Sequence, residues 1–300
     1  MTEIASRRRI RTTVVLALSL VDTTAHAWTV NATWETFAQG DPGGDQNLGQ
    51  GDGLYSGNSR TSVVTTNTHL GSKALSVFLP AGVENTWQTE FRLPTDIVDG
   101  QSVWARFYLY VPADFDWTCN PITKLFRLAV VDAAGGGAGF ASILATRPGS
   151  YGCAGAPNDF GYLVGGAELN SAPQFICQNV ASELHFLTPG TWHALELHVK
   201  ASATGSGVYR VWHNGVLTWE KTGLNTIPAG GAIFHGSGNV ANHLLGWWNG
   251  GVPKDQTIYF DDLTYTNDTP ANLDAAGNPM IGPTDWSVVR PSAPANLQAH

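Results

Sequence analysis

The sequence predicts an all-β fold, in which one large β-jelly roll, or sandwich, is built from two antiparallel sheets. Apolar and polar residues alternate over short runs, as in strands whose successive side chains point to opposite faces. Clusters of Gly, Pro, Asn and Asp separate these runs, and Gly alone accounts for 34 of the 300 residues. No long segment repeats its apolar residues with the period of a helix.

Ten runs are expected to form the strands. The clearest hairpin is "HNGVLTWE", because Asn214-Gly215 supplies two turn residues that readily adopt a positive φ. About 240 residues without an internal repeat fit one sandwich. The expected strands cover residues 74–79, 87–93, 103–111, 123–131, 139–145, 160–164, 192–200, 207–213, 216–221 and 257–266.

The two ends of the chain differ in composition from its middle. A basic start, an apolar run over 14–21 and the pattern Ala25-His26-Ala27 predict a secretory signal peptide over 1–27. The run is too short to span a bilayer. The jelly-roll domain is expected over 28–266, and the Pro- and Asn-rich residues 267–300 are expected to form a tail or linker. We therefore expect a secreted protein, extracellular or periplasmic.

The charge of the chain argues against several partners. The net charge is −8, from 16 basic and 24 acidic residues. Removing 1–27 takes away four arginines and two acids, which leaves 12 basic and 22 acidic residues and a net charge of −10. An acidic protein is a poor ligand for nucleic acid or for an anionic membrane. We expect a monomer that binds neither.

Three cysteines remain in a compartment that permits disulfides. Cys153 and Cys177 both fall in the Gly-, Pro- and Asn-rich region between strands, so we expect them to pair and Cys119 to stay free. Pairing of Cys119 with Cys153 is the alternative. None of the three has metal-ligand spacing, and no metal centre is expected from them.

The stretch "SVWARFYLYVP" carries an unusual strand face. Ala105, Phe107, Leu109 and Val111 form an ordinary core set, whereas the opposite set contains three aromatic residues around an arginine. Aromatic rings stack on the apolar faces of sugars, and arginine binds hydroxyls or carboxylates. We expect an open concave face that binds a glycan, lined by Trp104, Arg106, Tyr108 and Tyr110.

Basic side chains recur on other expected strands. His198 shares a polar face with Glu196, and Arg210 lies on a neighbouring strand. Lys124 and Arg127 have opposite parity, so only one of them can face a groove unless the strand contains a bulge. Arg210 is expected among the substrate-binding residues, and Arg127 and His198 among the candidate catalytic residues.

Three segments resemble the concanavalin-like jelly-roll polysaccharide lyases, above all the alginate and glucuronan lyases and heparin-lyase-like bacterial proteins. They are "SVWARFYLYVPADFDW…ITKLFRL", "GTWHALELHVKASATGSGVYRVWHNGVLTWEKTGLNT" and "WWNGGVPKDQTIYFDDLTY". The resemblance extends over roughly residues 87–266. It implies a secreted lyase that cleaves a uronic-acid polysaccharide by β-elimination.

The resemblance also implies site residues. Lys124 matches a lysine of these lyases, and Tyr162 in "FGY" matches the second tyrosine of a Tyr-x-Tyr pair whose first position is Phe160 here. Leu144 stands where the lyases have an arginine, and Arg147 is the nearest substitute. Elimination requires a group that neutralises the carboxylate, a base for the C5 proton and an acid for the leaving oxygen. Lys and Tyr suit these tasks, and His198 is a second candidate base because histidine titrates near neutrality.

Other functions remain open. The acidic charge, Phe160 and Leu144 favour a non-catalytic carbohydrate-binding, lectin-like module of a larger surface or secreted protein, and a structural matrix protein is a third interpretation. A glycosidase would need two suitably spaced carboxylates, and no strand shows the Glu-x-Asp-x-x-Glu array of jelly-roll glucanases. No cofactor is expected for catalysis. Asp261-Asp262 could cap neighbouring strands or bind a structural Ca²⁺.

Overall fold

The computed structural model describes most of the chain, and the described part is built from β-strands. The described residues are 26–44, 54–56, 60–83, 87–116, 122–146, 161–169, 172–176, 186–236, 242–247 and 252–284. Their backbone forms strands, turns and bends but no helix, which confirms the predicted all-β class. Within these ranges there is accordingly no helix that could cross a membrane.

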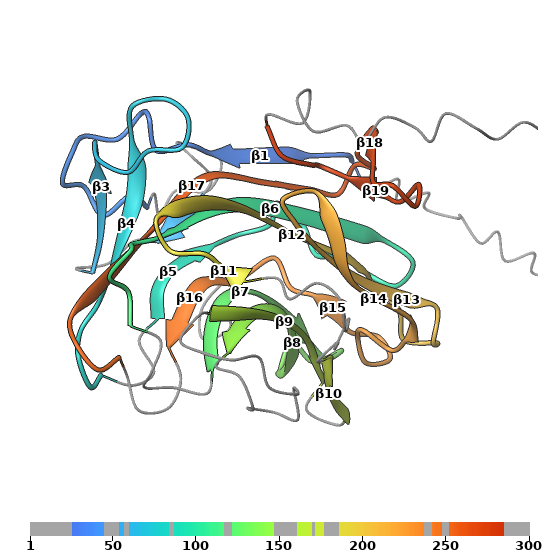
Figure 1. Cartoon of the computed structure of the whole chain (residues 1–300). Coiled ribbons are helices and arrows are strands. Elements are labelled where there is room, and N and C mark those ends of the chain that lie inside the picture. The colour runs from blue at the N-terminus through green and yellow to red at the C-terminus, as the bar shows by residue number, and fades with distance from the viewer. Residues whose placement is uncertain are drawn as a thin grey trace, which may run out of the picture.

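Two antiparallel sheets form the two layers (Figure 1). In the sheet called sheet A here, the order is β14 (Val216–Leu224), β13 (Gly207–His213), β12 (Thr191–Lys200), β6 (Ser102–Val111), β17 (Gln256–Thr266), β4 (Ala74–Leu79) and β3 (Thr61–Val64), with β1 (Thr29–Ala32) added beside β17. In sheet B it is β10 (Ala172–Ile176), β9 (Gly161–Leu169), β8 (Gly137–Thr146), β7 (Ile122–Val131), β16 (Asn242–Trp247), β5 (Trp87–Phe91) and β2 (Leu54–Ser56), with β11 (Phe186–Leu187) beside β9 and β15 (Ala232–Ile233) beside β7.

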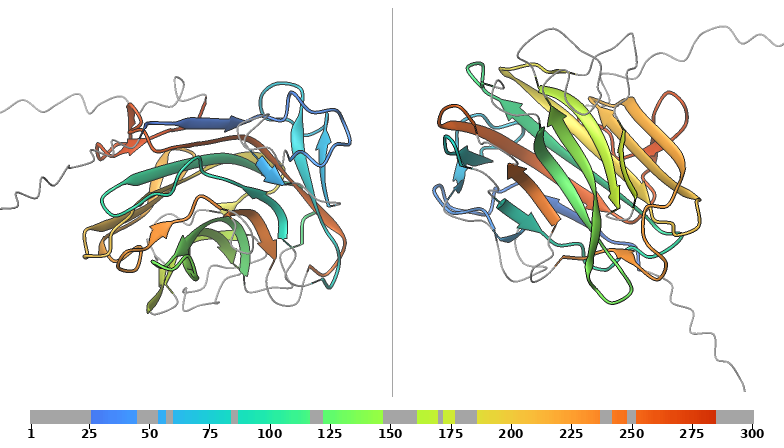
Figure 2. Two further views of the ribbon diagram at one scale, coloured as in Figure 1. Left: turned by 180° about the vertical axis from the view of Figure 1, so that it is seen from behind. Right: turned by 90° about the horizontal axis from the view of Figure 1, so that it is seen from below.

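The core lies between the inner faces of the two sheets. Phe107 of β6 and Leu109 are fully buried, as their parity predicted. Phe107 stacks on Phe126 of β7 with ring centroids 5.2 Å apart, and Phe126 stacks on Phe91 of β5 at 4.9 Å. Figures 1 and 2 show both sheets curved in the same sense, with sheet B on the inner side of the curve. The outer face of sheet B is therefore the concave face of the protein.

The aromatic face of β6 is not open, and this expectation was wrong. Trp104, Arg106 and Tyr108 lie on the convex outer face of sheet A and are only 4%, 6% and 3% exposed. A C-terminal segment covers them, and its hairpin of β18 (Asn272–Leu273) and β19 (Pro279–Met280) lies on the outer side of sheet A in Figure 1. Residues 267–284, which composition assigned to a tail or linker, thus form part of the packed sandwich.

Hydrogen bonds hold this C-terminal segment to the sheet. Trp104 Nε1 donates to Pro279 O at 3.0 Å, and Arg106 Nη1 donates to Gly282 O at 3.0 Å. The backbone N–H of Thr284 donates to the Tyr108 hydroxyl at 2.7 Å. The wall predicted for a sugar therefore binds the protein's own backbone. Tyr110, the last residue of the set, remains partly exposed.

Candidate active site

A bulge in β7 decides which side chains face the concave surface. Lys124 pairs with Leu144 of β8 but Phe126 pairs with Ile143, so Leu125 is an extra residue in this strand. Leu125 and Phe126 are both fully buried in the core. Because the extra residue reverses the alternation, Lys124 and Arg127 lie on the same outer face. The sequence left this point open, since the opposite parity of the two residues required a bulge.

Arg127 is held firmly at this position. It is 3% exposed, its guanidinium carbon lies 3.4 Å from the centroid of the Phe140 ring, and its Nε donates to Ser142 Oγ at 3.3 Å. Stacking of arginine on an aromatic face is attractive and restricts the side chain. Lys124, three residues away, is 7% exposed. Two cationic side chains thus lie next to each other on the concave face of an acidic protein.

The backbone register brings Tyr162 to the same face of sheet B. Val164 of β9 pairs with Leu144, which in turn pairs with Lys124, and Tyr162 is two residues from Val164. Residues directly opposite and residues two apart share a face of the sheet. Two strand spacings separate Tyr162 from Lys124 by about 10 Å across the sheet, and two residues separate them by about 7 Å along it. Lys124, Arg127 and the position of Tyr162 therefore share the concave face of sheet B.

A further histidine position was missed by sequence reasoning. His243 belongs to β16 and pairs directly with Arg127 on one side and Glu90 of β5 on the other. The register therefore produces a row of polar positions across sheet B, namely Glu90, His243, Arg127 and Ser142. The apolar run "LLGWW" after His243 was the available sign of a strand.

His198 and Arg210 do not join Lys124, which corrects their grouping with the catalytic face. Both lie on the outer face of sheet A, where they are direct cross-strand neighbours. His198 stacks on Trp104 at 4.3 Å between ring centroids, and Arg210 forms an ion pair with Glu220. Burial, followed by the charges of Arg210 and Lys200, lowers the pKa of His198 to about 3. His198 is thus neutral and is separated from Lys124 by the whole sandwich.

Three other expectations fall on residues that the structure does not describe. Arg147 as a substitute for the missing arginine, and the pairing of Cys153 with Cys177 while Cys119 stays free, lie outside the described residues. These remain predictions.

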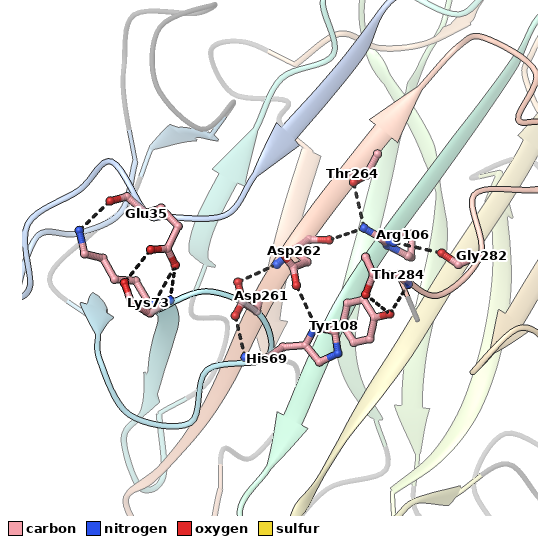
Figure 3. Close-up of polar contacts among 11 residues, drawn as sticks. Glu35, His69, Lys73, Arg106, Tyr108, Asp261, Asp262, Thr264, Gly282 and Thr284 are labelled. Carbon is pink, nitrogen blue, oxygen red and sulfur yellow. Dashed lines mark hydrogen bonds and ion pairs between the residues drawn. The ribbon is translucent and has the colours of Figure 1, made fainter. Parts of the chain in front are cut away.

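Asp261 and Asp262 bind a loop of the protein (Figure 3). Asp261 accepts hydrogen bonds from the backbone N–H groups of His69 and Asp262, both at 2.8 Å. Asp262 Oδ2 lies 2.8 Å from His69 Nδ1, and the His69 ring stacks on Tyr108 at 3.5 Å. Burial raises the pKa of Asp261 to about 7. The described residues contain no group of three or more His, Cys, Asp or Glu side chains that could hold a metal ion.

Comparison with known proteins agrees with the fold. The family model described as "Polysaccharide lyase" matches residues 169–264, which confirms the resemblance to polysaccharide lyases and supports the class of enzyme predicted. This match covers the sheet A strands β12, β13, β14 and most of β17, together with β10, β11, β15 and β16 of sheet B. No curated protein matches the sequence.

Solved structures of jelly-roll lyases superpose on the chain at low identity. The alginate lyase Aly36B, in a mutant complex with alginate tetrasaccharide, is 14% identical with a TM-score of 0.50, over 79% of this chain and 96% of its own. The alginate lyase vAL-1 from Chlorella virus is 11% identical with a TM-score of 0.50, over 70% and 89%. The endo-β-1,4-glucuronan lyase from the fungus Trichoderma reesei is 15% identical with a TM-score of 0.48, over 75% and 94%. At these identities the two matches with a TM-score of 0.50 show the jelly-roll fold alone.

Proposed function

We propose that the protein is a polysaccharide lyase that cleaves a uronic-acid polysaccharide, of the alginate or glucuronan type, by β-elimination on the concave face of sheet B. The observation that carries the proposal is the bulge in β7, because it places Lys124 and Arg127 on one face with the position of Tyr162. The match to the polysaccharide lyase family model supports the reaction class. The solved lyases named for alginate and glucuronan support the choice of substrate.

In this mechanism the two cations act on the uronate carboxylate. A cation beside the carboxylate stabilises the negative charge that develops when the C5 proton leaves. Arg127 suits this task because the Phe140 ring and the Ser142 hydroxyl hold its guanidinium in place, so little reorganisation accompanies the reaction. Lys124 lies on the same side of the strand and adds a second positive charge.

Tyr162 carries the proton transfers in the proposed reaction. Its phenolate, stabilised by a nearby cation, takes the C5 proton. The C4–O4 bond then breaks, a C4–C5 double bond forms, and the leaving oxygen receives a proton from the same phenol. One product has a new unsaturated non-reducing end, and the other has a new reducing end. No metal is needed for these steps, and we propose that turnover survives treatment with a chelator.

The decisive experiment measures ultraviolet absorbance of the unsaturated product. Purified protein is incubated with alginate, glucuronan and a neutral glucan, and absorbance should rise only with the uronates. Tyr162→Phe should remove most of the turnover, because it deletes the group that moves the proton. Tyr108→Phe is the matched control, because Tyr108 lies on sheet A, on the other side of the sandwich, where its hydroxyl forms a hydrogen bond with Thr284. Equal turnover in wild type and Tyr162→Phe would contradict the assignment.

Charge substitutions separate binding from catalysis. Lys124→Met should lower kcat more than it raises KM if the ammonium stabilises transition-state charge, and it should mainly raise KM if the ammonium only holds the substrate. Lys221→Met, at an exposed position of β14, is the control and should change neither. Unchanged kinetics in Lys124→Met would exclude the lysine from the site.

A non-catalytic carbohydrate-binding module is the second candidate function. It is favoured by Leu144, which occupies the position where the resembling lyases have an arginine and which pairs directly with Lys124. This reading requires that no polyuronate yields an unsaturated product while the protein still retains the glycan. We also propose that the protein is secreted, supported by the signal-like residues 1–27, and N-terminal sequencing of the exported protein tests this.

A further inference from the structure

One end of the outer face of sheet A remains uncovered and aromatic. Trp192 of β12 pairs with Tyr110 of β6, and Tyr110 pairs with Tyr259 of β17, so three aromatic residues follow one another across three strands. The ring centroids of Trp192 and Tyr110 are 5.5 Å apart, and those of Tyr110 and Tyr259 are 5.9 Å apart. All three are partly exposed, in contrast to Trp104 and Tyr108 on the same face.

A pocket opens beside this aromatic row. Its volume is about 320 Å³, and it is lined by Tyr110, Tyr259, Phe78, Pro112, Asp114 and Asp255 among others. Phe78 of β4 is 40% exposed, although it is a large apolar side chain on a strand. Pockets of this size that combine rings with a few polar groups are typical ligand sites. Exposed clusters of aromatic side chains also often mark binding sites.

We propose that this pocket is a second glycan-binding site, separate from the catalytic face, and that its ligand is a neutral oligosaccharide. Tilted rings at neighbouring strand positions offer apolar surface to successive pyranose faces, while carboxylate and amide groups accept and donate hydrogen bonds to hydroxyls. The tilt of 49° between Trp192 and Tyr110 and of 69° between Tyr110 and Tyr259 suits a chain whose sugar units rotate relative to one another.

Charge selects a neutral ligand over a uronate. The exposed carboxylates of Asp114 and Asp255 lie at the pocket. The nearby Lys254 is engaged by Asp114, with its ammonium donating to Asp114 O at 2.7 Å and lying 3.4 Å from Oδ2. Two acids against one paired cation make the pocket repel carboxylates. The cations Lys124 and Arg127 lie on the other face of the sandwich, the outer face of sheet B.

The two sites face opposite directions, since the pocket lies on the outer face of sheet A and the cations lie on the outer face of sheet B. The protein can therefore hold a neutral polysaccharide through one face while a uronate polymer occupies the other. The pocket does not depend on the proposed lyase activity, and its test needs no catalysis.

The experiment is affinity electrophoresis and calorimetry of the full chain with neutral gluco-, manno- and xylo-oligosaccharides and with alginate oligosaccharides. A neutral oligosaccharide should bind, and Tyr259→Ala and Phe78→Ala should each weaken binding about tenfold, which corresponds to about 1.4 kcal/mol. Leu273→Ala is the matched control, because it removes an exposed apolar side chain (53% exposed) from β18, and binding should be unchanged. Product formation from a uronate should be the same in all three variants.

Several results would overturn the proposal. These are the absence of binding to every neutral oligosaccharide, equal binding in wild type and Tyr259→Ala, or tighter binding of alginate than of neutral sugars that Tyr259→Ala abolishes. A variant that ends at Thr284 provides one more test. Binding by this variant but not by the full chain would show that residues 285–300 block the pocket, and the proposal that the full chain binds a glycan there would fall.

Discussion

The carboxyl group of Glu196 should make the protein less stable as the pH rises from about 5 to about 8. Glu196 of β12 is 3% exposed and accepts hydrogen bonds from Ile281 N at 2.6 Å and Gly282 N at 2.9 Å, which fix the C-terminal segment to sheet A. Burial raises its pKa from 4.5 to about 7, against the lowering effects of these two bonds and of Arg106, while Asp274 adds to the rise.

The sign follows from proton binding. Between pH 4.5 and about 7 the folded protein keeps the Glu196 proton while the unfolded chain has lost it. The free energy of unfolding therefore falls as the pH rises through this window, and above it the contribution is constant. A pKa difference of about 2.5 corresponds to about 3 kcal/mol at about 1.4 kcal/mol per pH unit. For a domain of this size, that is on the order of 5–10 °C in Tm.

Glu196→Gln removes the titrating group and nearly preserves its shape. Urea unfolding at pH 5, 6, 7 and 8 should show that the wild type loses about 3 kcal/mol more than the variant over this range. The comparison of slopes is independent of the absolute cost of the substitution. Glu220→Gln, at an exposed site paired with Arg210, should keep the wild-type slope. A Glu196→Gln protein with the full wild-type slope would refute the reasoning.

Three further outcomes can be checked in the same way. Gly231→Ala should lower the free energy of unfolding by about 1–3 kcal/mol in urea titrations, because a Cβ there would lie 2.3 Å from Val131 O. Burial lowers the pKa of His193, so its protonation should lower the free energy of unfolding as the pH falls below 6.5. In acid unfolding curves, His193→Gln should make this decrease smaller. The KM for a polyuronate should rise with added salt if Arg127 and Lys124 hold the carboxylate, and a salt-independent KM would contradict an ionic contact.

Long alternating runs allowed the main strands to be predicted closely. The expected strands 74–79 and 207–213 have the bounds of β4 and β13, and 103–111 lies within one residue of β6. Nine shorter strands were not predicted, because a few residues carry too little alternation to be distinguished from loops. They are β1, β2, β3, β10, β11, β15, β16, β18 and β19. Except for β18 and β19, which pair with each other, their positions depend on pairing with the longer strands.

Strand parity predicted the two faces of β6 correctly but not that the aromatic face would be covered. Phe107 and Trp104 lie on opposite faces as expected, yet the segment that covers Trp104 is about 175 residues further along the chain. That segment carries few apolar residues and is held through its backbone groups. Composition therefore gave no sign that it packs against the sheet.

The sequence did not predict the bulge in β7; it predicted only that Lys124 and Arg127 could share a face if the strand contained one. "KLFR" places two consecutive apolar residues between two cations, and both Leu125 and Phe126 can be buried only if the alternation slips by one residue. An uninterrupted strand would have pointed one of them away from the core. The loss of apolar burial in such a register is a physical reason for the bulge, and the bulge in turn gathers the two cations.

The contacts of Arg106 in β6 show why the proposed carboxylate site does not lie on sheet A. Arg106 donates to Gly282 O, Asp262 O and Thr264 Oγ1, and these acceptors lie within the protein (Figure 3). Binding a carboxylate there would require breaking these bonds and displacing the C-terminal segment, which leaves buried carbonyl groups without donors at about 1–3 kcal/mol each. Arg127 lies on the outer face of the other sheet, where the Phe140 ring and the Ser142 hydroxyl hold it on the same side of β7 as Lys124. The arginine that the sequence made most conspicuous is therefore structural, and the proposal assigns the carboxylate to Arg127, whose orientation depends on a bulge.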